Sequence, residues 1–310
     1  MNPNMDRFYF SNTKVLIADT LPASSNITRQ TLFDLGVRDF TITKSVDETR
    51  AQLEKDHFDI MISDAYLMDE CTAPIVSDLR QGNLGKDPFM PVIALTWEPT
   101  IEILQDLGTA GIDQMLTLPI SANKISQSLS SLIERRKQFV VTSRYIGPDR
   151  SKRDNQYAQQ VPRIKVPNAL RLKVTGDDGG VSAEEVLQTV QHQRVERYAH
   201  RIVYTIGKIA GLINDKNAGT MKTWMTDLHC TAIELNKRIT GTHFQQHQML
   251  GDTLLEVVER NLDNDRPNSK EIETLQQLAL SIQVGFTPEP TLMIDAEQDI
   301  SSNASGSIAA

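Results

Sequence analysis

Short apolar runs alternate with amphipathic stretches along the first part of the chain. Five runs have the length and composition of strands, at residues 15–18, 39–43, 58–63, 91–95 and 114–117. The stretches between them have helical patterns, such as 26–35, which stops at Gly36. Strands that alternate with helices predict βαβ units and a parallel sheet covered on both faces. We therefore predict an α/β fold with a doubly wound, five-stranded parallel sheet over residues 12–137.

Three of the five apolar runs end in a polar residue that can carry chemistry. These residues are Asp19, Asp64 and Thr96. In open α/β sheets, ligands bind at the carboxyl ends of the strands, near the point where the strand order reverses. The three side chains are therefore expected to converge on one site.

The hydrophobic period becomes helical after residue 181. Ser182 and Glu185 have the spacing of a capping box, and so do Asn268 and Glu271. Four apolar stripes at three- and four-residue spacing predict four helices within 181–286, an all-α helical bundle. The same spacing also suits a coiled-coil seam between two chains, which leaves a homodimer through this region open.

The segment between these two parts has a different composition. Residues 138–180 contain several prolines and glycines and show little periodicity, so we predict a basic linker. Residues 134–174 hold eleven Lys or Arg against three Asp or Glu, whereas the whole chain has a net charge of −8. We interpret this strip as a solvated tether, with contact to an acidic partner, nucleic acid or an anionic membrane surface as the alternative. Residues 287–310 are rich in Ser and acidic residues and are predicted to be disordered.

Bulk composition excludes several classes of protein. The net negative charge and the absence of a strongly basic helix argue against nucleic acid as a partner. Two distant cysteines, Cys71 and Cys230, provide no disulfide framework. The first ten residues lack the pattern of a signal peptide, and no apolar run is long enough for a membrane span. These features predict a cytoplasmic protein.

The strand-end residues resemble those of bacterial receiver domains of the CheY-like type, the signal-receiving part of two-component response regulators. The resemblance covers about the first 137 residues. It rests on Lys-Val-Leu-Ile-Ala-Asp at 14–19, Phe-Asp-Ile-Met-Ile-Ser-Asp at 58–64, Val-Ile-Ala-Leu-Thr at 92–96, Ala-Gly-Ile-Asp at 110–113 and Leu-Pro-Ile at 118–120. Residues 139–150 resemble a stretch that follows receiver domains in some alphaproteobacterial regulators. The helical region resembles no family that we recognise.

The resemblance implies roles for the three polar strand-end residues. Asp64 stands at the phosphoacceptor position, Asp19 at one position of the acidic pair that helps to hold Mg²⁺, and Thr96 at the position of the switch hydroxyl. In this family a phosphoryl group passes from a histidine of a sensor kinase to the aspartate. The resemblance thus implies a sensor histidine kinase as a partner.

Three positions depart from the family pattern. Thr20 stands in place of the second acid, Leu118 in place of a lysine, and Met115 where an aromatic switch residue is frequent. Magnesium relies on few charged ligands, so we expect weak Mg²⁺ binding and no other cofactor. The lost lysine removes a charge-assisted hydrogen bond of about 1.5–3 kcal/mol. We therefore expect weak or absent phosphorylation switching.

Three functions fit these features, and none of them is enzymatic. The first is an atypical receiver protein that works as a scaffold or adaptor in signal transduction. The second is a phosphorylation-gated regulator with Asp64 as the phosphoacceptor and the helical region as the output. The third is a nucleic-acid-binding regulator that uses the basic linker.

Histidines of the helical region give weaker signals. His243 and His247 share a helix face, but no acid completes a zinc pattern with them or with His229 and Cys230. His200 lacks the neighbours of a phosphotransfer histidine. We interpret all of these as structural residues.

Overall fold

The computed structural model describes residues 8–151, 161–212, 218–262 and 267–286. The predicted disordered tail, residues 287–310, lies outside these ranges. Two compact units are present, one comprising the described residues up to 140 and 144–186, the other 141–143 and the described residues from 187 onward. No helix among the described residues is long and apolar enough to cross a bilayer.

The first unit contains a five-stranded parallel sheet with the order β2-β1-β3-β6-β7. Its strands are β1 (Lys14–Ala18), β2 (Asp39–Thr43), β3 (Ile60–Asp64), β6 (Val92–Thr96) and β7 (Gln114–Thr117). Its helices are α1 (Pro22–Asp34), α2 (Val46–Lys55), α3 (Ala73–Gln81), α4 (Ile101–Ala110) and α5 (Ala122–Arg135). This is the flavodoxin-like strand order, and the predicted doubly wound fold is confirmed.

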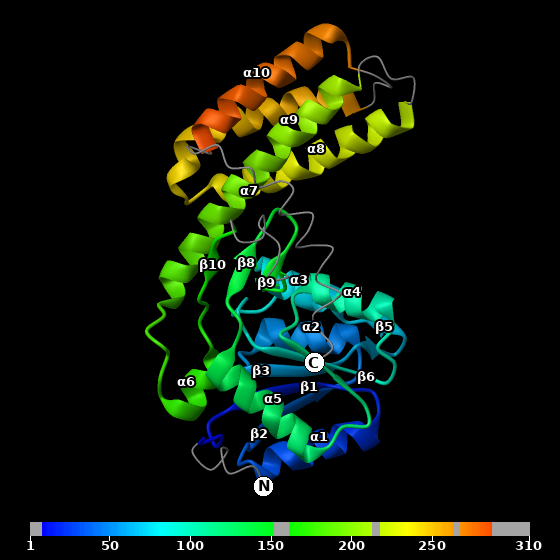
Figure 1. Cartoon of the computed structure of the whole chain (residues 1–310), viewed down its shortest axis with the longest axis vertical. Coiled ribbons are helices and arrows are strands. Elements are labelled where there is room, and N and C mark those ends of the chain that lie inside the picture. The colour runs from blue at the N-terminus through cyan, green and yellow to red at the C-terminus, as the bar shows by residue number, and fades with distance from the viewer. Residues whose placement is uncertain (1–7, 152–160, 213–217, 263–266, 287–310) are drawn as a thin grey trace. The chain divides into compact units, whose positions relative to one another are not determined.

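Helices cover both faces of this sheet (Figure 1). Successive strand residues point to opposite faces, so Val15 and Ile17 join one hydrophobic cluster while Leu16 joins the other. The first cluster also contains side chains of α1 and α5, and the second contains side chains of α2, α3 and α4. This two-sided burial explains why the strands are apolar at nearly every position.

The segment predicted as an extended linker is instead structured where it is described. It contains β8 (Phe139–Val141), β9 (Ile146–Pro148), β10 (Arg163–Ile164) and α6 (Ala169–Thr175). Strands β8 to β10 form a small sheet in the order β10-β8-β9. Leu170 and Val174 of α6 are buried in the same hydrophobic cluster as α1 and α5. The expectation of a solvated tether is therefore wrong for these residues, because isolated apolar side chains anchor a segment that lacks obvious periodicity.

A buried ion-pair cluster secures the start of this segment. Asp113 accepts hydrogen bonds from Arg80 at 2.9 Å and from Arg136 at 2.7 Å, and these three side chains are almost completely inaccessible to solvent. Arg136 also donates to the carbonyl of Pro167, and Arg150 donates to the carbonyl of Ile112. Burial lowers the pKa of Arg80 to about 10 despite the opposing charge of Asp113. These contacts thus tie Arg136, Arg150 and Pro167 to the end of the parallel sheet.

Two glycines allow the backbone to approach closely at the same place. A Cβ on Gly111, whose φ is +94°, would lie 2.6 Å from the carbonyl oxygen of Ile146, and one on Gly147 would lie 2.9 Å from the Cα of Gly111. Any larger residue at Gly111 would have to push the following segment away.

The second unit is helical. It contains most of α7 (Ala183–Gly211), together with α8 (Ala218–Ile239), the 3₁₀ helix η2 (His243–His247), α9 (Gln248–Leu262) and α10 (Ser269–Phe286). The four predicted stripes meet in one hydrophobic cluster, which includes Ile202, Leu228, Leu254 and Ile282. At α10, Asn268 accepts from the Glu271 amide at 2.9 Å and Glu271 accepts from the Asn268 amide at 2.7 Å, so the capping box forms as expected.

Candidate functional site

The three predicted strand-end residues lie at one edge of the receiver sheet. Asp19 follows β1, and Asp64 and Thr96 are the last residues of β3 and β6. Strand β3 lies between β1 and β6 and is parallel to both, so the three residues occupy neighbouring strand ends. All three are buried. The structure therefore brings together the residues that the sequence pattern singled out.

Asp19 is held by the first turn of α1. One carboxylate oxygen accepts from the Leu21 amide at 2.7 Å, and the other accepts from the Ser24 hydroxyl. The α1 helix has no other side-chain cap at this end, and a negative charge is favourable near a helix N-terminus. Asp19 therefore has both oxygens occupied. Ser24 has no sequence signal other than its place in the first turn of the following helix.

Asp64 lies beside Asp19 without a positive charge to balance the two carboxyls. Its side chain is 7% exposed, and its Oδ1 atom has no hydrogen-bond partner. Burial, followed by the charge of Asp19 and a hydrogen bond shared with it, raises the pKa of Asp64 to about 8. No basic side chain of the described residues opposes this rise. Burial and Asp19 therefore favour the protonated form of Asp64, and a carboxylic acid is a poorer nucleophile for a phosphoryl group than a carboxylate.

The hydroxyl of Thr96 is engaged within its own loop. It donates to the carbonyl oxygen of Glu98 at 3.1 Å, and the carbonyl of Thr96 itself accepts from the amide of Leu118 at 2.7 Å. A switch hydroxyl would have to break the bond to Glu98 before it could donate to a group on Asp64.

The three atypical residues supply no replacement for the missing groups. The side chain of Leu118 is buried in the hydrophobic cluster formed with α1 and α5, and Met115 is buried in the cluster on the opposite face. Thr20 is half-buried beside Asp19 in sequence. The position of the family lysine is thus occupied by a core side chain.

The acidic pair of Asp19 and Asp64 does not fit a resident magnesium ion. Mg²⁺ needs near-octahedral oxygen ligands with several charges close by. Here both oxygens of Asp19 already accept hydrogen bonds, and Thr20 offers no carboxylate. Among the described residues, no group of three or more acidic, histidine or cysteine side chains could hold a metal ion.

A tight hairpin directly follows the acidic pair and was missed by the sequence pattern. Strands β4 (Tyr66–Leu67) and β5 (Glu70–Cys71) pair antiparallel across a two-residue turn. Met68 and Asp69 in that turn have φ values of 49° and 69°. Positive φ at both positions defines a type I′ turn, which prefers Asn-Gly. This hairpin lies between Asp64 and helix α3.

The combined change Met68→Asn with Asp69→Gly is expected to stabilise the protein by about 0.5–1 kcal/mol. Left-handed backbone is costly for ordinary residues, and Met68 is largely exposed, so its side chain contributes little packing. The free energy of unfolding is measured in urea, with hydrogen exchange of the β3 amides as the probe of unfolding. Met249→Asn in helix α9 is the control, and it should cost a few tenths of a kcal/mol. A loss of stability in the hairpin variant would contradict the prediction.

Comparison with known proteins identifies similar solved structures. The chemotaxis response regulator CheY4 of Vibrio cholerae is 25% identical, with 38% of this chain and 96% of that chain covered and a TM-score of 0.34. The receiver domain of a Pseudomonas aeruginosa sensor histidine kinase, solved with magnesium in its active-site cleft, is 18% identical, with 37% and 93% covered and a TM-score of 0.34. Salmonella typhimurium RcsB, a response regulator studied for its interaction with DNA, is 12% identical, with 93% and 99% covered and a TM-score of 0.35. No protein-family model and no curated protein matches the sequence.

The assignment of the fold rests on the strand order, and the residues at the strand ends agree with it. The order β2-β1-β3-β6-β7 is that of the receiver fold, and buried aspartates follow β1 and end β3, with a threonine at the end of β6. Thr20 and Leu118 depart from the family pattern at two charged positions. The first part of the chain thus has the α/β fold and strand order of receiver domains, and a helical region follows it.

Proposed function

We propose that this receiver protein works in signal transduction as a protein-interaction scaffold or adaptor, with phosphorylation switching weak or absent. The observation that carries the proposal is the uncompensated acidic pair. Two buried carboxyls lie side by side, and burial and Asp19 raise the pKa of Asp64 to about 8. A phosphoryl group on Asp64 would add further negative charge to a site without a described cation.

The switch geometry supports the same proposal. Phosphorylation switches work by a local charge change that biases a bistable element. Here the Thr96 hydroxyl is bonded to Glu98, and Leu118 lies in the core instead of presenting a lysine. Neither group is free to bind a phosphoryl oxygen. Magnesium binding to the acidic pair is accordingly proposed to be weak.

The basic segment supports a protein partner more than a nucleic acid. Among its described residues, Arg136 is bound to Asp113, and Arg163 to Asp149 at 2.6 Å. Arg171 pairs with Asp177. Arginines that are held in internal contacts contribute little to the phosphate neutralisation on which nucleic-acid binding depends. The basic strip is therefore structural in our proposal.

The helical unit is the proposed contact region for that partner, which includes a second copy of the chain. Leu280 and Val284 are one helical turn apart on α10 and are among its most exposed apolar side chains. Neighbouring apolar residues on one helix face are typical of protein contact surfaces.

A phosphodonor assay tests the proposal. The chain is incubated with acetyl phosphate and Mg²⁺, and phosphorylation is read by intact mass spectrometry. We expect trace labelling of the natural chain and none of Asp64→Asn. The double variant Thr20→Asp with Leu118→Lys should gain about tenfold or more, because it restores a charged ligand and a charge-assisted hydrogen bond.

Two results would contradict this proposal. Strong labelling of the natural chain that disappears in Asp64→Asn would favour the phosphorylation-gated regulator, with a sensor histidine kinase as its donor. Unchanged labelling of the double variant would show that the two substitutions are not what weakens the site.

A further inference from the structure

A cavity of about 290 Å³ lies in the helical unit, where the end of α8 approaches α7. It is lined by Leu187, Gln188, Gln191, His192, Lys237, Arg238, Thr240, Gly241 and Thr242. Its volume is at the lower end of the range of about 300–1,000 Å³ for small-molecule sites. None of the functions discussed above uses this cavity.

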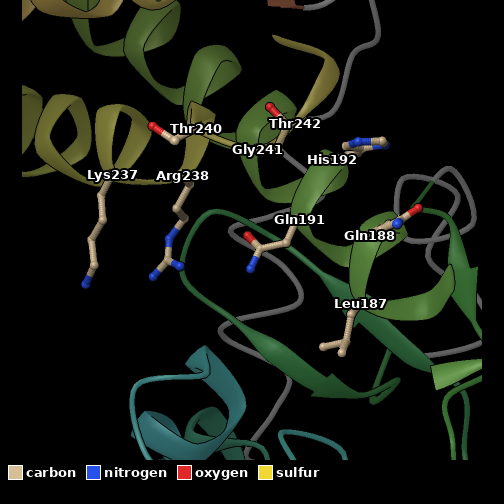
Figure 2. A pocket seen from close by; sticks show the side chains of 9 residues that line it. All are labelled: Leu187, Gln188, Gln191, His192, Lys237, Arg238, Thr240, Gly241 and Thr242. Carbon is tan, nitrogen blue, oxygen red and sulfur yellow. The ribbon is translucent and has the colours of Figure 1, made fainter. Parts of the chain in front are cut away.

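The lining is positively charged. Figure 2 shows that Lys237 and Arg238 extend in the same direction, and Gln191 of α7 lines the same cavity. No acidic side chain is among the lining residues, and Lys237 forms no ion pair with the described residues. Lys237 and Arg238 are adjacent cations, and Lys237 has no acidic partner among the described residues. Such a pair favours an anionic ligand.

The side chain of Arg238 is fixed in position by burial and by an ion pair with Glu234. Its side chain is 8% exposed, and Glu234 accepts from Nε at 3.1 Å and lies 2.9 Å from Nη2. Burial, and the charge of Arg238 among its neighbours, lower the pKa of Arg194 on the facing helix. Glu234 is the carboxylate that pairs with Arg238, and Lys237 adds a second cation to the lining of the cavity.

The remaining groups fit a ligand that carries both a phosphate and an organic part. Gln188, Gln191 and Thr240 offer neutral hydrogen-bonding groups. Leu187, which is 40% exposed, supplies an apolar wall. A bare inorganic ion would leave that wall unused.

We propose that this cavity is a binding site for a small organic phosphate monoester. Lys237 and Arg238 hold the phosphate, Gln191 donates to it through its amide, and the organic part lies against Leu187. Arginine and lysine differ in geometry but both are established phosphate binders. The proposal is independent of the acidic pair in the receiver domain.

Calorimetric titration of the full chain at fixed ionic strength tests the proposal. The probes are glycerol 3-phosphate and adenosine 5′-monophosphate, with glycerol, adenosine and inorganic phosphate as comparisons. We expect saturable binding of at least one ester and none of glycerol or adenosine. Lys237→Gln should weaken that binding about tenfold or more, the cost of one charge-assisted hydrogen bond.

Lys222→Gln is the matched control, because Lys222 is exposed on the same helix about 22 Å from Lys237 along the axis. It should leave binding unchanged. Absence of saturable binding by both esters would overturn the proposal, and so would equal weakening by Lys222→Gln. Inorganic phosphate that binds as tightly as the esters would overturn the role of Leu187.

Discussion

Replacing Asp113 with alanine is expected to lower the free energy of unfolding of the receiver unit by about 3–5 kcal/mol. Among the described residues, Asp113 is the only acidic side chain that forms an ion pair with Arg80 or Arg136, and all three side chains are almost fully buried. Removing the carboxylate leaves two buried positive charges facing each other. It also removes the acceptor of the Val92 amide at the start of β6.

Asp78→Ala is the matched control for this variant. Asp78 pairs with Arg50, but both side chains are about one-third exposed, so the pair is screened by solvent. Its loss should cost about 0.2–1 kcal/mol. The unfolding free energies of the two variants are compared by urea titration, with hydrogen exchange of the β6 and β7 amides as the probe. Similar losses in both variants would show that the Asp113 cluster contributes no more than a surface pair.

Replacing Asp64 with asparagine is expected to stabilise the receiver unit, by an amount that grows with pH. The pKa of Asp64 is raised in the folded state to about 8, from 3.8 in the unfolded chain. Between these values the folded state binds more protons than the unfolded state, so the unfolding free energy falls as pH rises, at up to ~1.4 kcal/mol per pH unit. Asparagine does not titrate, so the unfolding free energy of the variant does not decrease with pH for this reason.

The expected gain is small at pH 4 and reaches about 2–4 kcal/mol at pH 8, with the full linkage as its upper limit. Unfolding free energies measured by urea titration at pH 5, 6, 7 and 8 for both proteins give the difference. Asp106→Asn, an exposed residue on α4, is the control and should give no pH-dependent gain. A constant difference between the natural chain and Asp64→Asn across this range would contradict the raised pKa.

The receiver fold could be predicted because its strands are buried on both faces. Runs such as 15–18 and 60–63 are apolar at nearly every position, which marks their place in a covered sheet. The helices could be predicted equally well, since the apolar residues of each one recur at spacings of three and four. The described residues of 138–180 have neither pattern, because their structure depends on contacts with Ile112, Leu132 and other residues far away in sequence.

The candidate site was predictable in part. Asp19, Asp64 and Thr96 ended apolar runs, and parallel strands bring such ends together. The engagement of Thr96 with Glu98 and the hydrogen bonds to Asp19 could not be predicted, because they depend on loop conformation. The cavity around Lys237 could not be predicted either, since its residues come from α7 and from the end of α8 with the turn that follows it, about 50 positions apart in sequence.

The two touching glycines also limit how this protein can be recombined. Gly111 lies within the receiver sequence and Gly147 beyond its predicted end, yet their backbones meet where no side chain fits. Leu170 and Val174 likewise complete the receiver core from beyond that end. A chimera joined at residue 137 would therefore lack these two core side chains and the hydrogen bonds from Arg136 to Pro167 and from Arg150 to Ile112, whereas one joined after residue 186 would keep them.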